Sequence, residues 1–553
     1  MANQTKKWEV LHKTLTNTPQ LLIDVLLENR GIKTVKQKKE FFNPINPVEM
    51  SLRSLGIKET EVKKAIDRIR KAKKTGEHVI IYGDYDADGI TGTATMWESL
   101  HELGIFVLPH IPERFSEGYG LNLESVKKLK KEDSKLGLVI TVDHGITAGK
   151  KVDELKKLGI DMIITDHHQA GKKMPRPLAL IYTTKIGGSA LAWFFAREIV
   201  KSFKYQASGI ESRLELAAIG TIADQIPLIG PNRSIVKYGL NILNRTKRPG
   251  LLALYKEAGL TEIGPYEIGF MIAPRINSMG RLKHGLESLR LLCTRDKNKA
   301  VEIAENIGHT NHERQKIVDE VVAHAKNSYK NIEKQYVIVL AHESYHEGVI
   351  GLAAAKLVEE FYRPAIVLSK SGDISKASAR SISGFNIIEA IRTLENLYIE
   401  GGGHPMAAGF SIETSKIDIF TKEISKIAKE FITDDLLQRK LKIDLEINFE
   451  EINSEIVKSI KLFEPTGLGN PGPTFVSRKV EIVNARTVGK DARHLKLVLK
   501  QHEQVFDSIY FGGGEFYPKL NQGLNADVVF QIQEDFWNGN GRIQLKIKDI
   551  HCY

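Results

Sequence analysis

The stretch HVIIYGDYDADG, residues 78–89, decides the fold because it joins an apolar run to a cluster of acids. Asp84, Asp86 and Asp88 follow the apolar run at alternate positions, and the next fifteen residues, ITGTATMWESLHELG, have the pattern of a helix. An apolar run, a glycine-bounded turn and a helix in this order predict one strand–helix unit of a parallel sheet.

The same pattern recurs further along the chain. IFVLPHIP, LGLVITVDHG and DMIITDHH read as strands, and the helical AGKKVDELKKLG separates the last two. Repeated strand–helix–strand units predict a parallel sheet with helices on both faces, and such sheets bind ligands outside the carboxyl ends of their strands. GDYDADG, DHG and DHH lie at those ends, so the sequence predicts a site there.

The chain has 553 residues, more than one core holds, since single cores stop growing at about 250–300 residues. The predicted fold class is α/β, with a second, smaller α/β domain joined by a long helix and a C-terminal β-barrel of the OB type. The predicted boundaries are 1–295 for the first domain with an N-terminal extension, 296–332 for the connecting helix, 333–432 for the second domain and 440–553 for the barrel.

Composition narrows the function classes. The net charge is +11, which suits a polyanionic partner such as nucleic acid, although solvated faces of lysine-rich helices explain it equally well. Cys293 and Cys552 form no CxxC pair, which excludes a zinc knuckle and a disulfide framework. No run approaches the roughly 20 apolar residues of a membrane helix, and the polar start is unlike a secretory signal. We therefore expect a cytoplasmic protein with no membrane partner.

The acids and histidines predict a metal centre. Three aspartates so close repel one another unless a cation neutralises them. A calcium-type loop or an Asx-rich turn is the alternative, and an EF-hand is excluded because no glutamate stands at the twelfth position. Asp143 ends the next strand, and Asp166, His167 and His168 end another. Carboxylate and imidazole without thiolate suit manganese, magnesium or zinc.

Two such ions about 3.5–4 Å apart can clamp the attacking and leaving oxygens of a phosphoryl transfer. Asp224, in GTIADQIPL, is a further candidate ligand, although its spacing alone is a weak signal. A lone histidine near a strand end is more often structural, but two histidines and two aspartates at neighbouring strand ends favour a metal site.

These motifs also carry a family resemblance. GDYDADG, VDHG, TDHH and the aspartate of GTIADQIPL resemble the four successive motifs of the DHH phosphoesterase superfamily. Over nearly the whole chain, the order and content of the motifs resemble the RecJ family in particular: ERFSEGYGL, IGTIADQIPLIGPNR, IAPRINSMGRL, YHEGVIGLAAAKL, KASARSISGFNIIEAI, GGGHPMAAGF and FEPTGLGNPGPTF.

The resemblance implies an activity. It implies a single-stranded-DNA-specific exonuclease that works from 5′ to 3′ by two-metal-ion hydrolysis with Mn²⁺ or Mg²⁺, in DNA repair and recombination. It further implies a monomer whose partners include a single-strand-binding protein and a RecQ-type helicase. A DHH phosphodiesterase acting on small substrates, such as an oligoribonuclease or a cyclic-dinucleotide enzyme, is one alternative, and a non-enzymatic single-strand-binding relative is another.

The resemblance also assigns residues in the first domain. The implied metal ligands are Asp84, Asp86, Asp88, Asp143, His167 and Asp224, with Asp143 bridging the two ions. His168 would contact the scissile phosphate, and Asp166 would orient the imidazoles. Many DHH enzymes have histidine where this chain has Tyr82, so the first metal would rely more on Asp84.

Phosphate and nucleic-acid contacts are implied in both domains. Ser378, Arg380 and Arg114 would hold a terminal phosphate, His404 lies in a glycine-rich turn, and Arg275, Asn277 and Arg281 would line the strand path. The alternatives are a strand-joining loop at His404 and ordinary surface ion pairs for the arginines. In the barrel, the stacking candidates are Phe511, Phe536 and Trp537, of which at least one is expected to be core.

Overall fold

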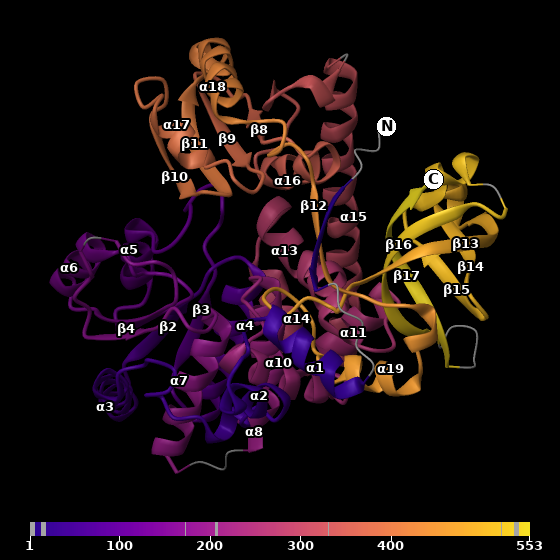
Figure 1. Cartoon of the computed structure of the whole chain (residues 1–553). Helices are drawn as coiled ribbons and strands as arrows, with labels where there is room; N and C mark the ends of the chain where they lie inside the picture. Colours follow the sequence, from indigo (N-terminus) through magenta and orange to yellow (C-terminus); the bar gives the residue numbers. More distant parts are fainter. Residues whose placement is uncertain are drawn as a thin grey trace. The chain divides into compact units, whose positions relative to one another are not determined.

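The computed structural model describes most of the chain (Figure 1). The described residues are 6–12, 18–171, 173–204, 208–329, 331–520, 522–535 and 541–553. They form two compact units. One comprises Asn46–Ile226 and Ser234–Gln438, and the other comprises Met1–Ile45, Pro227–Arg233 and Arg439–Tyr553.

A five-stranded parallel sheet forms the centre of the first unit, in the order β3-β2-β4-β5-β6. Its strands are β2 (His78–Tyr82), β3 (Val107–His110), β4 (Leu136–Val142), β5 (Asp161–Asp166) and β6 (Ala179–Tyr182). Every residue of β4 is buried, as expected for a central parallel strand covered on both faces. The predicted α/β class with a parallel sheet is confirmed.

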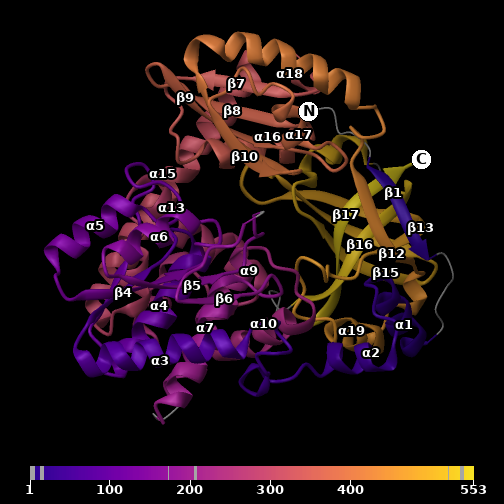
Figure 2. The ribbon, with the colours of Figure 1, turned by 90° about the vertical axis from the view of Figure 1, so that its left-hand side faces the viewer.

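Two hydrophobic cores lie on opposite faces of this sheet, because alternate residues of a strand point to opposite sides. Val79 and Ile81 join one core, and Ile80 and Tyr82 join the other. The first core is completed by α3 (Glu59–Thr75), α4 (Ala87–Glu102) and α7 (Gly188–Ser202), and α3 and α7 are both visible in Figure 2. The second core is completed by α5 (Leu123–Glu132) and α6 (Gly149–Lys157).

A helical region follows the sheet and packs around α4. Its elements are α8 (Ser208–Ser212), α9 (Leu214–Ala223), α10 (Gly230–Leu243), α11 (Pro249–Ala258), α12 (Pro265–Glu267), η2 (Ile268–Ile272), α13 (Ala273–Leu282) and α14 (Leu286–Cys293). The predicted connecting helix is present as α15 (Lys297–Ser328), which Asp296 caps by accepting from two backbone N–H groups.

The second α/β domain has a mixed sheet in the order β10-β11-β9-β8-β7. Only β7 (Ile338–His342) and β8 (Ala365–Ser369) pair in parallel. The antiparallel strands are β9 (Ile374–Arg380), β10 (Glu400–His404) and β11 (Ala407–Glu413). The helices of this domain are α16 (Ile350–Phe361), α17 (Ile387–Arg392) and α18 (Ile417–Phe431).

The other unit contains a closed five-stranded barrel of the OB type, which confirms the predicted architecture. The barrel closes because β13 (Phe475–Val488) pairs with both β14 (His494–Gln501) and β16 (Asn525–Asp535). Its other strands are β15 (Gln504–Tyr510) and β17 (Arg542–Cys552), and β12 (Lys440–Glu446) leads into it beside β13. Helix α19 (Ser454–Lys461) packs on its core.

Residues 1–45 belong to this barrel unit, whereas the sequence grouped them with the first domain. Strand β1 (Lys7–His12) pairs in parallel with β12. Helices α1 (Pro19–Asn29) and α2 (Val35–Phe42) bury their apolar faces in the core of the barrel unit. Arg233 ties the segments together, because its guanidinium donates to the carbonyl oxygens of Phe41, Leu462, Phe463, Glu464 and Pro465.

Candidate metal centre

The three aspartates of the first motif do not share one strand face, because the strand stops at Tyr82. Asp84 is buried in the turn, and its carboxylate accepts from the N–H of Tyr85 at 2.7 Å. Asp86 is the N-cap of α4 and accepts from the N–H of Gly89 at 3.0 Å. Asp88 lies in the first helical turn. The positive end of the helix dipole favours carboxylates at these positions.

The N-terminus of α7 lies against two of the carboxylates. Both oxygens of Asp88 accept backbone N–H groups, from Gly188 at 2.7 Å and from Ser189 at 2.9 Å. A Cβ atom at Gly188 would lie 2.3 Å from Oδ1 of Asp143, so this close approach requires glycine. The helix therefore fixes Asp88 while leaving room for Asp143.

Asp143 has a left-handed backbone, with φ of +68°, directly after β4. Aspartate adopts this region more readily than most residues, and such conformations concentrate at functional sites. The N–H of Asp143 donates to the carbonyl oxygen of Thr165 at 3.0 Å, which ties it to the end of β5. Asp224 arrives from another direction as the C-cap of α9.

His167 points at three carboxylates. Its Nε2 atom lies 3.0 Å from Asp143, 3.6 Å from Asp224 and 3.7 Å from Asp88. Both His167 Nε2 and Asp143 Oδ1 are buried, and although they lie 3.0 Å apart, neither forms a hydrogen bond of regular geometry with any described residue. Buried polar atoms without a partner are costly, so these two fit a cation between them.

The predicted ligands form overlapping groups whose ligand atoms lie within 4.8 Å of one another. The groups are Asp84, Asp86 and Asp143; Asp88, His167 and Asp224; and Asp143, His167 and His168. All six predicted ligands are therefore brought together, and Asp143 belongs to two of the groups. A set of carboxylate oxygens and imidazole nitrogen suits Mn²⁺ or Mg²⁺.

Electrostatics also favour a cation at this position. Burial, followed by the neighbouring carboxylates, raises the pKa of Asp84 and Asp143 well above the usual range and the pKa of Asp224 to about 8. Without a positive charge these carboxylates resist ionisation, and a bound divalent cation would reverse that preference.

The remaining histidines of the motifs have different environments. Asp166 bonds Nδ1 of His168 at 2.8 Å, and this hydrogen bond is the main reason that the pKa of His168 rises to about 9. Asp166 also accepts from the N–H of Ile146, so its orientation is fixed. His144 instead contacts the carbonyl oxygen of Tyr82 at 2.9 Å, and burial lowers its pKa to about 4. His144 is therefore a neutral structural residue.

Tyr82, which stands where many DHH enzymes have histidine, belongs to a side network. Its hydroxyl donates to Glu117 at 3.2 Å, and Glu117 also bonds His110 at 2.9 Å. The N–H of Asn122 donates to the same hydroxyl at 3.2 Å. Tyr82 thus anchors the loop that carries Arg114.

An arginine cluster lies beside the carboxylates within the same unit. Burial and the neighbouring Arg114, Arg314 and Arg380 lower the pKa of Arg281 to about 10. Arg281 donates to the carbonyl oxygen of Gly348 at 3.3 Å, and Arg380 donates to Ser378 at 3.3 Å. None of these four guanidiniums has an ion pair with a carboxylate among the described interactions, which leaves the cluster suited to an anion.

The start of α16 approaches Ser378 and Arg380. A Cβ atom at Gly351 would lie 3.0 Å from the Ser378 hydroxyl and 3.3 Å from the Arg380 guanidinium. A helix N-terminus beside arginines favours phosphate.

Three predicted contact residues lie elsewhere or have other partners. Arg275 forms an ion pair with Glu257, so the structure gives it a bracing contact. Asn277 accepts from the N–H of Ala87 at 2.7 Å and so holds the start of α4. His404 lies at the end of β10, which is exposed along its length. Arg275 nevertheless neighbours Arg314, and His404 lies in register with Arg380 across Ala407 of β11, so both residues flank the arginine cluster.

Two residues of the site were not predicted from the sequence. Arg314 is one of many charged residues on α15, and only its place beside Arg281 distinguishes it. The Tyr119 hydroxyl lies 3.5 Å from Nε2 of His168. Its position in ERFSEGYGL, beside Arg114, was the available signal.

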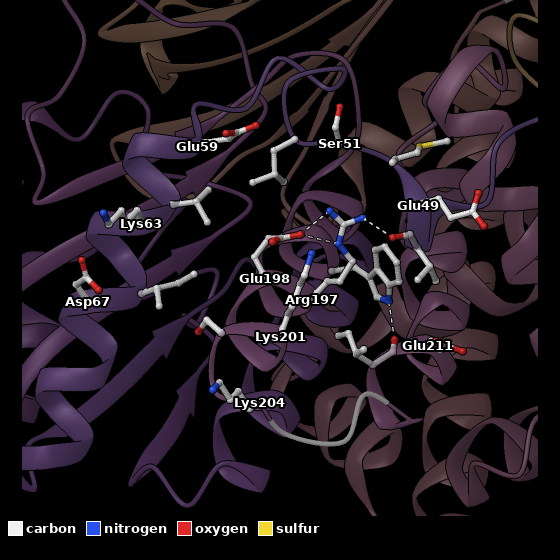
Figure 3. A pocket seen from close by; sticks show the side chains of 18 of the residues that line it. Glu49, Ser51, Glu59, Lys63, Asp67, Arg197, Glu198, Lys201, Lys204 and Glu211 are labelled. Atoms are coloured by element: carbon white, nitrogen blue, oxygen red, sulfur yellow. Dashed lines mark hydrogen bonds and ion pairs between the residues drawn. The ribbon is translucent and has the colours of Figure 1, made fainter.

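A large cavity of about 1030 Å³ lies among α3, α7 and residues 48–52, and it contains none of the predicted site residues (Figure 3). Its walls carry five acids and five bases, and some of these, such as Arg197 and Glu198, pair with each other. A balanced charge gives no preference for a polyanion.

In the barrel, Phe511 is exposed with Lys546 over its ring, while Phe536 and Trp537 lie outside the described residues.

Comparisons with known proteins agree with this anatomy. Residues 78–221 match the DHH family N-terminal domain, residues 333–430 match the DHHA1 domain, and residues 443–549 match the RecJ OB domain.

Relatives that match most of this chain are RecJ exonucleases. The single-stranded-DNA-specific exonuclease RecJ of Bacillus subtilis is 34% identical over 98% of this chain and 70% of its own length. The RecJ of Thermus thermophilus is 33% identical over 88% of this chain and 71% of its own length. A crystal structure of RecJ in complex with Mn²⁺ from Thermus thermophilus matches with a TM-score of 0.82 and 27% identity, over 100% of this chain and 80% of that chain. The chain thus belongs to the RecJ family of the DHH phosphoesterases.

Proposed function

We propose that this chain is a divalent-metal-dependent exonuclease that degrades single-stranded DNA from the 5′ end. The observation that carries the proposal is the juxtaposition of a carboxylate–imidazole cluster with an arginine cluster that forms no ion pair with a carboxylate among the described interactions. The relatives' names supply single-stranded DNA as the substrate, and the RecJ structures with Mn²⁺ and Mg²⁺ support these ions as cofactors.

The six grouped residues would hold the metal ions: Asp84, Asp86, Asp88, Asp143, His167 and Asp224. Bound ions of this kind polarise the phosphoryl oxygens and lower the pKa of water. His168 is held by Asp166 with Nε2 toward Tyr119, where a protonated imidazole can donate to a phosphate oxygen. All residues with a proposed role in hydrolysis therefore belong to the first domain.

We propose that the arginine cluster sets the 5′-to-3′ direction of digestion. A terminal phosphate carries more charge and one more free oxygen than an internal diester, so several guanidiniums favour it over the rest of the strand. Arg114, Arg281, Arg314 and Arg380, with Ser378, are the proposed contacts. A strand seated by its 5′ phosphate would present its first diester to the neighbouring carboxylates.

The barrel is proposed to grip the strand rather than to cleave it. Phe511 is 54% exposed beside Lys546, which fits stacking combined with a phosphate contact. Deleting the barrel would also remove the core partner of residues 1–45. Phe511→Ala is therefore the cleaner test, and we expect weaker binding of long strands with unchanged cleavage of very short ones.

The structure contains no helix, within its described residues, that is long and apolar enough to cross a membrane. We further propose that the enzyme works as a cytoplasmic monomer in DNA repair and recombination, with a single-strand-binding protein and a RecQ-type helicase as partners.

End-labelled single- and double-stranded DNA and RNA, digested with Mn²⁺, with Mg²⁺ or with EDTA, test the proposed activity. We expect metal-dependent release of nucleotides from the 5′ end of single-stranded DNA. Activity in EDTA would refute the metal assignment, and digestion from the 3′ end would refute the polarity. Cleavage of short oligonucleotides alone would favour a small-substrate DHH enzyme, and binding without cleavage would favour the non-enzymatic alternative.

A further inference from the structure

The helical run from α12 through η2 to α13 has one open face that leads to the metal centre. Residues 272, 273, 276, 279 and 280 are buried. Residues 266, 270, 274, 277 and 281 are among those that are not buried, and these five recur at the three- to four-residue spacing of one helix side. In order, this open face carries Tyr266, Phe270, Pro274, Asn277 and Arg281.

The outer end of the open face is an exposed aromatic pair. Tyr266 is 60% exposed and Phe270 is 68% exposed. Their rings stack with centroids 4.8 Å apart and planes inclined by 27°. Single exposed apolar side chains are common on protein surfaces, but two stacked rings present a flat apolar surface in a fixed orientation.

A π-helical turn, η2, contains Phe270 and helps to hold the aromatic pair on the surface. The N–H of Ala273 donates to the carbonyl oxygen of Ile268, five residues earlier. Pro274 has no N–H to donate to the carbonyl oxygen of Phe270, so the regular helical ladder is interrupted at this point. Such turns are frequent at functional sites.

The inner end of the open face reaches the proposed catalytic machinery. Asn277 holds the N–H of Ala87 at the start of α4, and Arg281 belongs to the arginine cluster. A Cβ atom at Gly269 would lie 3.8 Å from Ile222, two residues before Asp224. From Phe270 to Asn277 the helix rises about 10 Å, so the aromatic pair lies within a few nucleotides of the site.

We infer that Tyr266 and Phe270 form a stacking platform for nucleobases of the single strand held in the site. The inference rests on the proposed function and specifies a substrate contact for it. Base stacking on aromatic rings does not depend on sequence, which suits an enzyme that moves along any strand. Continuity with Asn277 and Arg281 favours a nucleic-acid strand over an apolar protein segment as the occupant.

The test compares intact strands with strands that lack one base. A set of 5′-phosphorylated single strands would carry an abasic residue at each successive position, and binding would be measured by fluorescence anisotropy in EDTA, which prevents cleavage. For the wild-type chain we expect affinity to fall roughly tenfold when the abasic residue occupies the platform position, and little elsewhere.

The double variant Tyr266→Ala/Phe270→Ala should bind intact strands roughly tenfold more weakly and lose its sensitivity to the abasic position. Phe270→Leu separates stacking from apolar contact, because leucine keeps the bulk without the ring. Phe431→Ala is the matched control, since Phe431 is a 62% exposed phenylalanine at the end of α18 and should keep the wild-type profile. Thermal unfolding midpoints of all variants should match that of the wild type.

A flat abasic profile in the wild type would overturn the platform, and so would a double variant that keeps the wild-type profile. If the double variant bound DNA normally, an apolar protein segment would become the favoured occupant. If the wild type neither bound nor degraded single strands, the proposed function itself would fail, which is a different result.

Discussion

Two clusters of like charge lie side by side in the first unit, and they are stabilised in different ways. The carboxylates around Asp143 receive backbone N–H groups from helix starts, notably those of Gly188, Ser189 and Gly89. The arginines around Arg281 donate mainly to carbonyl oxygens and to one hydroxyl. Burial raises the pKa of Asp143 well above its usual range and that of Asp224 to about 8, whereas Arg281 keeps a pKa of about 10. One cluster therefore requires a cation to be fully ionised, and the other is a permanent receptor for an anion.

The largest effect is expected from breaking the carboxylate cluster at its shared member. Asp143→Asn keeps the shape but removes the charge that two ligand groups have in common. We expect turnover on single-stranded DNA to fall by at least about a thousandfold, as in other sites that lose metal-assisted chemistry. Strand binding, measured by anisotropy, should persist.

Asp373→Asn is the control for that substitution, because Asp373 is an exposed residue outside both clusters. Near-native turnover of Asp143→Asn would show that the metals do not depend on this carboxylate.

Breaking the arginine cluster should produce a smaller and more selective effect. Arg380→Ala removes one charge-assisted bond, worth about 1.5–3 kcal/mol, so kcat/KM on 5′-phosphorylated strands should fall roughly 10- to 100-fold. Strands with a 5′ hydroxyl should lose little. Arg392→Ala, which removes an exposed arginine paired with Glu389, should change neither substrate.

Equal losses on both substrates, together with a lower unfolding midpoint, would show that Arg380 only braces the second domain. Rescue by Arg380→Lys should be partial, because an ammonium lacks the planar fork of the guanidinium.

The carboxylate cluster was predictable from the sequence because its residues are concentrated in short motifs at strand ends. Asp84, Asp86 and Asp143 could be placed from local pattern alone, whereas Asp224 needed the family resemblance. The arginine cluster was harder, because its members come from four separate segments and a single arginine has no local signature. Arg314 was missed for that reason, and the assignment of Arg275 to the strand path stays a prediction, with an ion pair to Glu257 beside it.

The fold shows the same contrast. The hydrophobic period and the succession of strands and helices along the chain could be read from short stretches of sequence, so the parallel sheet, the connecting helix and the barrel were all predicted. The place of residues 1–45 was not, because β1 pairs with β12 more than 400 residues away and its short strand carries no mark of that partner.

His168 bears on the same comparison because it is a side chain beside the carboxylates that can carry a positive charge. Asp166→Asn keeps an oxygen that can accept from Nδ1, but it weakens the hydrogen bond that mainly raises the pKa of His168 and removes the carboxylate charge that adds to that rise. Partners of this kind typically contribute about 10–100-fold, and we expect a loss of that size in kcat with little change in KM. The pH profile of kcat should also shift, since the imidazole would lose its proton at lower pH. A loss confined to KM would instead indicate a role in strand binding.

The smallest expected effect is on the pH dependence of stability in the metal-free protein. The carboxylate cluster should contribute to this dependence, and the arginine cluster should not. Buried carboxylates whose folded-state pKa is raised bind more protons when folded than when unfolded, so stability falls as pH rises from the ordinary aspartate pKa toward the raised one. For Asp224 that window runs from 3.8 to about 8. Arg281, with a pKa of about 10, remains protonated throughout this window and contributes no slope. We therefore expect the EDTA-treated protein to lose several degrees of unfolding temperature between about pH 5 and pH 8, and added Mn²⁺ to restore most of the loss at pH 8. Asp224→Asn in EDTA should show a weaker pH dependence than the wild type. A metal-free protein that is equally stable across this range would mean that the carboxylates are already neutralised by groups of the chain itself.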